Sequence, residues 1–321
     1  MISIYKNTEQ DKTIKKLDNI EPGTWINIVS PSEQELIFVS KKTGVSLDFL
    51  KASLDEEETS RIDIEDNNMI VILDIPFTEM EDNSLTYDTY PLAIINTPNN
   101  IITVCLKNSK ILTDFFNNKV KSFYTFKRSR FILQILYRVA SYFLLYLRQI
   151  DKKSVMIEKK LHKSMKNREL ILLLSLEKSL VYFSTSLKAN EITLEKMLKL
   201  DIIQRYPEDQ DILEDVIIEN KQAIEMANIY SNILSGTMDA FASVISNNLN
   251  IVMKLLASIT IVMSIPNIIF GSFGMNLNGI PFSKSSQGFG LACGVTVILC
   301  IVCIIILKKR TYSNELHIIN Y

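Results

Sequence analysis

Two long apolar runs near the C-terminal end dominate the pattern of hydrophobic and polar positions. Residues 255–273 and 289–307 each contain 19 residues and no charged side chain. A helix of that length rises about 28 Å, close to the hydrocarbon thickness of a bilayer. We therefore predict a transmembrane helix in each run.

The charges that flank these runs predict their orientation. Lys254 precedes the first run, Lys308, Lys309 and Arg310 follow the second, and Lys284 is the only charge in the link. Basic residues favour the cytoplasmic side. We predict a multi-pass protein of the cell membrane with cytoplasmic N- and C-termini, an external loop at 274–288 and a cytoplasmic basic tail at 308–321.

A third apolar stretch, at 131–150, has a different pattern. It carries Arg138 and Arg148, and its apolar residues fit one wide helical stripe. Because charges in a spanning segment are costly, we interpret this stretch as a buried helix and not as a further span.

Strand patterns and turn signals alternate in residues 1–115. Apolar, β-branched segments at 24–31, 67–77, 90–96 and 101–107 predict strands, and a helix is expected to begin in the segment 32–44. These elements predict a small mixed α/β domain at 1–115 on the cytoplasmic side.

The pattern becomes helical from 116 onward. Helices are expected near 128–163 and 167–190 in a cytoplasmic hairpin region at 116–206, with breaks around 164–167 and 189–190. Pro207 can open the next helix, and no proline follows Asp211 until Pro266. We predict one helix from about 211 to 273, with the stalk at 207–254 continuing into the first span. The fold class is therefore an α+β membrane protein. Such a rod must pack on copies of itself or on the other helices.

A stripe of mostly small and polar residues follows a seven-residue repeat along this helix. Its members are Asp239, Ser243, Ser246, Asn250, Met253, Ala257, Thr260, Ser264, Asn267, Gly271 and Gly274. Bulky residues such as Ile261 and Ile269 lie off it. One interpretation is close helix packing, which small residues allow. The other, which the asparagines and Asp239 favour, is a water-filled pore lined by several copies of the helix.

Composition restricts the chemistry further. The net charge is −1, so no global basic field points to nucleic acid. Residues 1–100 hold 19 acidic and 8 basic residues, which suits a cytoplasmic domain tethered to a membrane. Three of the four cysteines lie in the second apolar run, where we expect small apolar side chains and no zinc site or disulfide framework. No hydrolase triad, P-loop or dinucleotide motif is present, so we expect no enzyme and no organic cofactor.

The motif Gly274-Met275-Asn276 closes the first apolar run, which contains Pro266. A short link and a second run with a basic end follow it, and ILSG at 233–236 and NIVMKLL at 250–256 precede it. This part of the chain, about 211–310, resembles the CorA-type magnesium transporter family. The N-terminal domain matches only in length and general pattern.

The resemblance implies a homopentamer whose five first-span helices line one pore, with the Gly-Met-Asn loop holding a hydrated cation at the outer mouth. Mg²⁺ loses water reluctantly, so Asn276 side-chain and Gly274 main-chain oxygens suit the hydrated ion. The loop lacks an acid, and Lys284 repels cations. Zinc-transporting relatives share the motif, so Zn²⁺, Co²⁺ and Ni²⁺ remain alternatives to Mg²⁺.

The resemblance also implies a regulatory site at which cytoplasmic Mg²⁺ bridges acids of neighbouring subunits. Asp215 matches one bridging acid, and Glu79 is preferred over Glu81 and Asp82 as its partner. The alternative for each is a solvated surface carboxylate, and for the three N-terminal acids the sequence favours that alternative at least as strongly. The alternative of another class is a membrane-anchored sensor or scaffold without a pore, in which the polar stripe would tolerate bulky apolar replacements.

Overall fold

The computed structural model describes residues 1–10, 13–65, 67–81, 84–120, 123–164, 167–200, 206–275 and 287–318, although the side chains of Glu81, Ser84, Ser164 and 310–318 are not described. The chain forms two compact units, the first ending at Met238 and the second beginning at Asp239.

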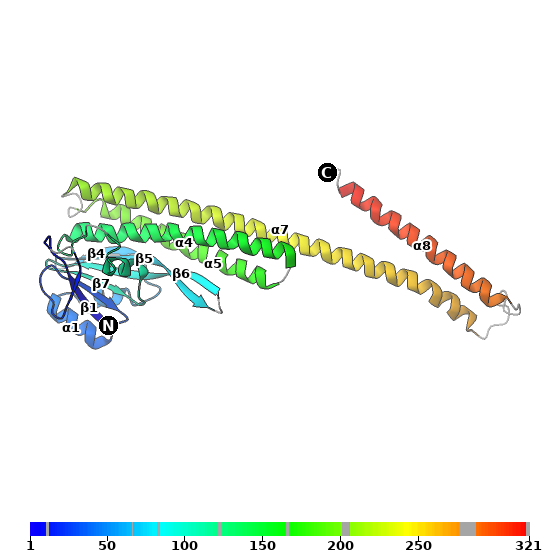
Figure 1. Cartoon of the computed structure of the whole chain (residues 1–321), viewed down its shortest axis with the longest axis horizontal. Helices are drawn as coiled ribbons and strands as arrows, with labels where there is room; N and C mark the ends of the chain where they lie inside the picture. The colour runs from blue at the N-terminus through cyan, green and yellow to red at the C-terminus, as the bar shows by residue number, and fades with distance from the viewer. Residues whose placement is uncertain are drawn as a thin grey trace. The chain divides into compact units, whose positions relative to one another are not determined.

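The first unit contains a seven-stranded sheet and most of the helices, and the second contains the end of α7 and all of α8 (Figure 1). The elements are β1 (Ile2–Lys6), β2 (Lys15–Leu17), β3 (Trp25–Val29), α1 (Glu33–Thr43), α2 (Leu47–Ala52), β4 (Arg61–Glu65), β5 (Asn68–Glu81), β6 (Ser84–Asn96), β7 (Ile101–Cys105), α3 (Lys110–Phe116), α4 (Arg128–Ser164), α5 (Asn167–Met197), α7 (Pro207–Phe273) and α8 (Gly288–Ile318).

The strand order is β2-β1-β3-β7-β6-β5-β4. Among the strand pairings in the described part of the chain, β3–β7 is parallel and the others are antiparallel. With helices grouped in long segments after the sheet, this arrangement is α+β. The predicted strands at 24–31, 67–77, 90–96 and 101–107 are confirmed as β3, β5, β6 and β7, whereas β1, β2 and β4 were not predicted.

One face of the sheet is covered by α1 and α2. Ser32 caps α1, because its hydroxyl accepts from the N–H of Glu35 while the Glu35 carboxylate accepts from the N–H of Ser32. Gly44 ends α1 with φ 74°, a left-handed conformation that glycine adopts without strain. Leu36 and Val39 of α1 pack into the core between helix and sheet.

The other face of the sheet is covered by α3, α4 and α5 (Figure 1). Trp25 is fully buried there and packs edge-on against Phe115 and Phe131, with ring centroids 6.1 and 5.0 Å away. Residues 131–150 lie in α4 with most of their apolar side chains buried, which confirms them as a buried helix. Arg138 pairs with the buried Asp114 of α3, so its charge is compensated.

Of the helix break predicted at 164–167, residues 165–166 lie outside the described residues, while α4 ends at Ser164 and α5 begins at Asn167. The break predicted at 189–190 is wrong. The α5 helix continues through Asn190 to Met197. The side chain of Asn190 accepts from the Asp74 N–H at 2.9 Å and donates to the Asp74 carbonyl at 2.8 Å, so it binds strand β5 and leaves its own helix intact. Asn190, a residue type that often ends helices, thus binds α5 to the sheet.

The predicted long helix is confirmed as α7, a 67-residue helix that begins at Pro207. It contains the first apolar run, and α8 contains the second and continues as a helix to Ile318. Four described helices, namely α4, α5, α7 and α8, are long and apolar enough to cross a membrane by length and composition.

Candidate functional site

The candidate pore residues from Asp239 to Gly271 all lie on α7. No side chain from 242 to 275 is buried in the single chain. Residues of the stripe and residues off it are exposed alike, for example Met253 at 56% and Ile268 at 69%. Exposure in one chain therefore does not distinguish a pore from a packing seam, and the assignment of the stripe to a pore stays a prediction.

Two hydroxyl groups of the stripe, those of Thr260 and Ser264, bond within their own helix. Thr260 donates to the Leu256 carbonyl at 2.9 Å, and Ser264 donates to the Ile261 carbonyl at 2.7 Å. Their protons are thus used locally, while lone pairs of the oxygens can still accept from water. The stripe can present acceptor oxygens, the group that a hydrated cation requires.

Pro266 interrupts the hydrogen bonds of α7 inside the apolar run. Proline has no N–H, so the carbonyl four residues earlier, at Val262, loses its usual donor. The thiol of Cys300 on α8 lies 3.9 Å from that carbonyl oxygen and donates to it. Cys300, predicted only as a small apolar residue, therefore also connects the two apolar helices.

The candidate selectivity motif begins where α7 ends. The Gly274 N–H donates to the Phe270 carbonyl at 3.0 Å, and the Met275 N–H donates to the Ser272 carbonyl at 3.3 Å. A Cβ on Gly274 would lie 3.4 Å from the Gly271 carbonyl oxygen, an ordinary contact. The local fold of one chain thus does not by itself require glycine here. Asn276 lies outside the described residues.

Asp215 lies on the exposed side of α7, whereas its neighbours Val216 and Ile217 are buried in the first unit. Its carboxylate is therefore presented to solvent in the single chain. Among the residues that the structure describes, no group of three or more His, Cys, Asp or Glu side chains is placed to hold a metal ion.

Glu79, the other candidate regulatory ligand, is paired with a lysine. The Lys107 ammonium lies 2.9 Å from the Glu79 carboxylate and donates to the Tyr90 hydroxyl at 2.8 Å. It also lies over the Tyr90 and Phe77 rings, 4.5 and 5.4 Å from their centroids. The hydrogen bonds to Tyr90 and Glu79 raise the pKa of Lys107. Of the two other candidates, Asp82 lies outside the described residues, and so does the side chain of Glu81.

Sequence reasoning missed three charged neighbours of Glu79, namely Lys107, Asp88 and Lys178. Lys107 lies two residues after the end of β7, and nothing in its sequence context indicates the ion pair. Asp88 of β6 lines a 570 Å³ pocket together with Glu79 and with Lys178 and Tyr182 of α5. In the β5–β6 register, Glu79 lies opposite Thr86 and Phe77 lies opposite Asp88. Directly opposite residues share a face, as do residues two apart on one strand, so Glu79 and Asp88 lie on the same face of the hairpin. That register could not be read from the sequence.

Comparison with known proteins covers almost the whole chain. Residues 22–309 match the family described as CorA-like Mg²⁺ transporter protein. The chain is 25% identical to the cobalt/magnesium transport protein CorA of Methanocaldococcus jannaschii over 300 residues, which are 89% of this chain and 90% of that protein. It is 22% identical to the protein of the same name from Thermotoga maritima over 325 residues, 96% of this chain and 88% of that protein.

A solved structure has the same fold. The complete structure of the CorA magnesium transporter from Methanocaldococcus jannaschii superimposes with a TM-score of 0.80 and 25% identity, covering 96% of this chain and 98% of that one. The likeness therefore includes both the sheet domain and the long helices.

Proposed function

Because the chain belongs to the CorA-like Mg²⁺ transporter family, we propose that it carries divalent cations, with Mg²⁺ as the main substrate, across the cell membrane. The observation that carries the proposal is the match over residues 22–309, which includes the polar stripe, Gly274-Met275-Asn276 and both apolar runs. The two CorA relatives are named for cobalt and magnesium transport, so Co²⁺ is the first alternative substrate.

In the proposed membrane arrangement, α7 and α8 each cross once, the link is external, and the N- and C-termini are cytoplasmic. The distribution of buried side chains supports the choice of these two among the four apolar helices. In the most apolar segments of α4 and α5, 61% and 39% of residues are buried, against none in α7 and 11% in α8. Exposed apolar surface of this extent needs lipid or partner helices.

The proposed conducting form is a homopentamer with five copies of α7 around one pore. Oxygens of Asn250, Thr260, Ser264 and Asn267 would then face the axis and contact the water shell of the ion. Mg²⁺ keeps its water more firmly than Ca²⁺, so a wide ring of neutral oxygens suits the hydrated ion. Gly274 and Asn276 form the selectivity ring at the outer mouth.

Cytoplasmic divalent cation is proposed to close this pore through Asp215. Like charges near an intersubunit surface repel unless a cation lies between them. Exposure of Asp215 supports this role, and Glu79 is its proposed partner from the sheet domain. Because Lys107 already neutralises Glu79, the ion has to compete with an internal ammonium group there.

Ion flux in liposomes tests the proposal. The purified protein is reconstituted, and uptake of Mg²⁺, Co²⁺, Ni²⁺ and Zn²⁺ is measured with indicator dyes, with empty liposomes and K⁺ uptake as controls. We expect saturable Mg²⁺ uptake and little K⁺ uptake. Uptake equal to that of empty liposomes for all four ions would contradict transport and favour a membrane-anchored sensor or scaffold.

A further inference from the structure

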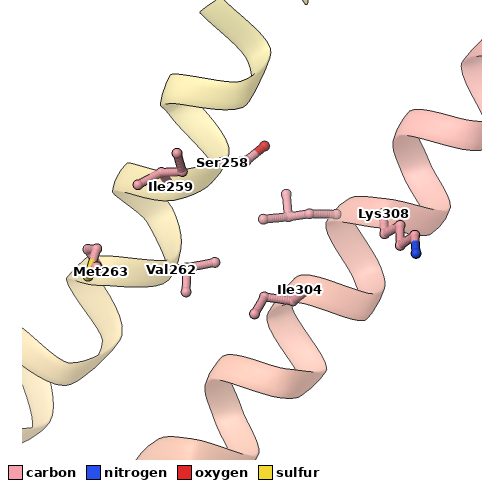
Figure 2. Close-up of a pocket in the computed structure, with 7 residues that line it drawn as sticks. Ser258, Ile259, Val262, Met263, Ile304 and Lys308 are labelled. Carbon is pink, nitrogen blue, oxygen red and sulfur yellow. The ribbon is translucent and has the colours of Figure 1, made fainter. Parts of the chain in front are cut away.

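An apolar groove of 450 Å³ lies between α7 and α8 within the second unit (Figure 2). Ile259, Val262 and Met263 form its wall on α7, and Ile304 and Leu307 form its wall on α8. Figure 2 shows Val262 and Ile304 on the facing sides of the two helices. The apolar walls suit a hydrocarbon chain and not a hydrated ion.

One end of the groove is polar. Ser258 and Lys308 complete the lining and lie at the same end in Figure 2, away from Met263 and Ile304. Lys254 lies one helical turn before Ser258, whose hydroxyl donates to the Lys254 carbonyl at 2.7 Å. Long lysine side chains extend along apolar surface and place their ammonium group at the membrane interface. The groove thus ends at a cationic rim.

We propose that this groove binds an acyl chain of an anionic phospholipid of the inner leaflet, whose phosphate pairs with Lys308 and Lys254. Basic sites between transmembrane helices on the cytoplasmic side recognise anionic headgroups in this way. The inference rests on the membrane orientation in the proposed function, since that orientation places the cationic rim at the cytoplasmic surface.

Charge favours a lipid over a helix from a second copy of the chain. Between Asp239 and Glu315 the sequence contains no Asp or Glu, but it contains five basic residues, namely Lys254, Lys284, Lys308, Lys309 and Arg310. A second copy of this hairpin would therefore bring further lysines, and no carboxylate, to the depth of Lys308. A phospholipid supplies the missing anion together with a chain that matches the apolar walls.

The test measures the lipid that stays on the full-length protein after reconstitution in vesicles and detergent extraction. Vesicles contain equal parts of phosphatidylglycerol and phosphatidylcholine, and retained lipid is counted by native mass spectrometry. We expect the parent to retain phosphatidylglycerol preferentially. Lys308→Gln should reduce that retention about five-fold, the equivalent of about 1 kcal/mol per lysine. Lys309→Gln, the matched control outside the groove, should change it less than about two-fold.

A second pair of variants tests the apolar walls. Ile304→Trp fills the groove and should abolish preferential retention, whereas Ile305→Trp, at an exposed neighbour that does not line it, should not. Equal retention of both lipids by the parent, or unchanged retention in Ile304→Trp, would overturn the proposal. So would efficient disulfide formation between Val262→Cys on one copy and Ile304→Cys on another, in chains without native cysteines.

Mg²⁺ uptake in the same vesicles separates this inference from the proposed function. Uptake without retained phosphatidylglycerol refutes the lipid site alone. Retained phosphatidylglycerol without uptake refutes transport and leaves the lipid site in place.

Discussion

At the residue scale, the buried carboxylate of Asp114 neutralises the charge of Arg138 in the apolar helix α4. It accepts from Arg138 and, at 2.7 Å, from the Tyr142 hydroxyl, and Lys119 lies 3.1 Å away. Burial alone would raise the pKa of the Asp114 carboxyl, but the hydrogen bonds from Tyr142, Lys119 and Arg138 outweigh it and lower that pKa. The network fastens α3 to α4 beside the buried aromatic cluster.

Asp114→Asn should lower the free energy of unfolding by about 2–3 kcal/mol at pH 7, because Arg138 loses its anionic partner. A lowered folded-state pKa stabilises the fold above the unfolded-state value of about 3.9, and this stabilisation is lost as pH falls through the folded-state pKa. The difference between parent and variant should therefore shrink below about pH 4. Fluorescence of Trp25, the only tryptophan, reports unfolding. A difference that persists unchanged to pH 2 would contradict this assignment.

Lys107 is predicted to weaken cation binding at Glu79. Lys107→Met keeps an apolar stem against Phe77 and Tyr90 but frees the carboxylate. If Glu79 binds the regulatory ion, the Mg²⁺ concentration for half-maximal protection from protease should fall about two- to five-fold, the range for a partly exposed ion pair. Lys110→Met is the matched control, since Lys110 donates to the Thr78 hydroxyl. Equal shifts in both variants would exclude a specific role for Lys107.

At the scale of elements, local signals predicted where α1 and α7 begin, but they did not predict structure that depends on residues far apart in the sequence. Ser32 with Glu35 and the glycine at position 44 specify α1 locally, and Pro207 opens α7. The helix break predicted at 189–190 was wrong because the amide of Asn190 binds the main chain of Asp74, which lies 116 residues earlier in the sequence. Likewise, the contact between Cys300 and the Val262 carbonyl, and the pair of Glu79 with Lys107, depend on how separate elements pack. Sequence periodicity carries no information about such contacts.

The stripe on α7 leads to a labelling prediction. Single cysteines at Asn250, Ser264 and Asn267, in a chain without native cysteines, should react with a water-soluble thiol reagent and block Mg²⁺ uptake by more than about ten-fold, since the reagent fills a pore shared by all copies. Ile261→Cys and Ile269→Cys, off the stripe on the same helix, are the controls. Equal reaction on both sets would favour a packing seam over a pore.

At the scale of the whole molecule, the proposed transporter couples a cytoplasmic cation site to a membrane pore. Asp215 and the stripe lie on the same helix, α7, so a change at one can reach the other along that helix. The coupling is reciprocal in its binding energies, because an ion that stabilises the closed form also binds that form more tightly.

Asp215→Lys should remove the inhibition of uptake by internal Mg²⁺. The fixed ammonium group replaces the bridging ion and abolishes the carboxylate repulsion. We expect Mg²⁺-dependent protease protection of α7 to fall at least about five-fold, a coupling of about 1 kcal/mol, with transport retained. Glu214→Lys, at the preceding exposed acid, should keep the response of the parent. Full Mg²⁺-dependent protection in Asp215→Lys would exclude this residue from the sensor.

In the proposed transporter, a cation passes through a ring formed by Gly274-Met275-Asn276. The most direct test compares Mg²⁺ uptake by liposomes containing the parent, Asn276→Ala and Asn278→Ala, after each is shown to fold and assemble alike. Asn278 lies in the same link two residues later and controls for a general loss of polarity. The proposed mechanism predicts at least about ten-fold slower uptake for Asn276→Ala, since removing ligand oxygens from every copy weakens the selective site, and near-parental uptake for Asn278→Ala. Parental uptake by correctly assembled Asn276→Ala would contradict it.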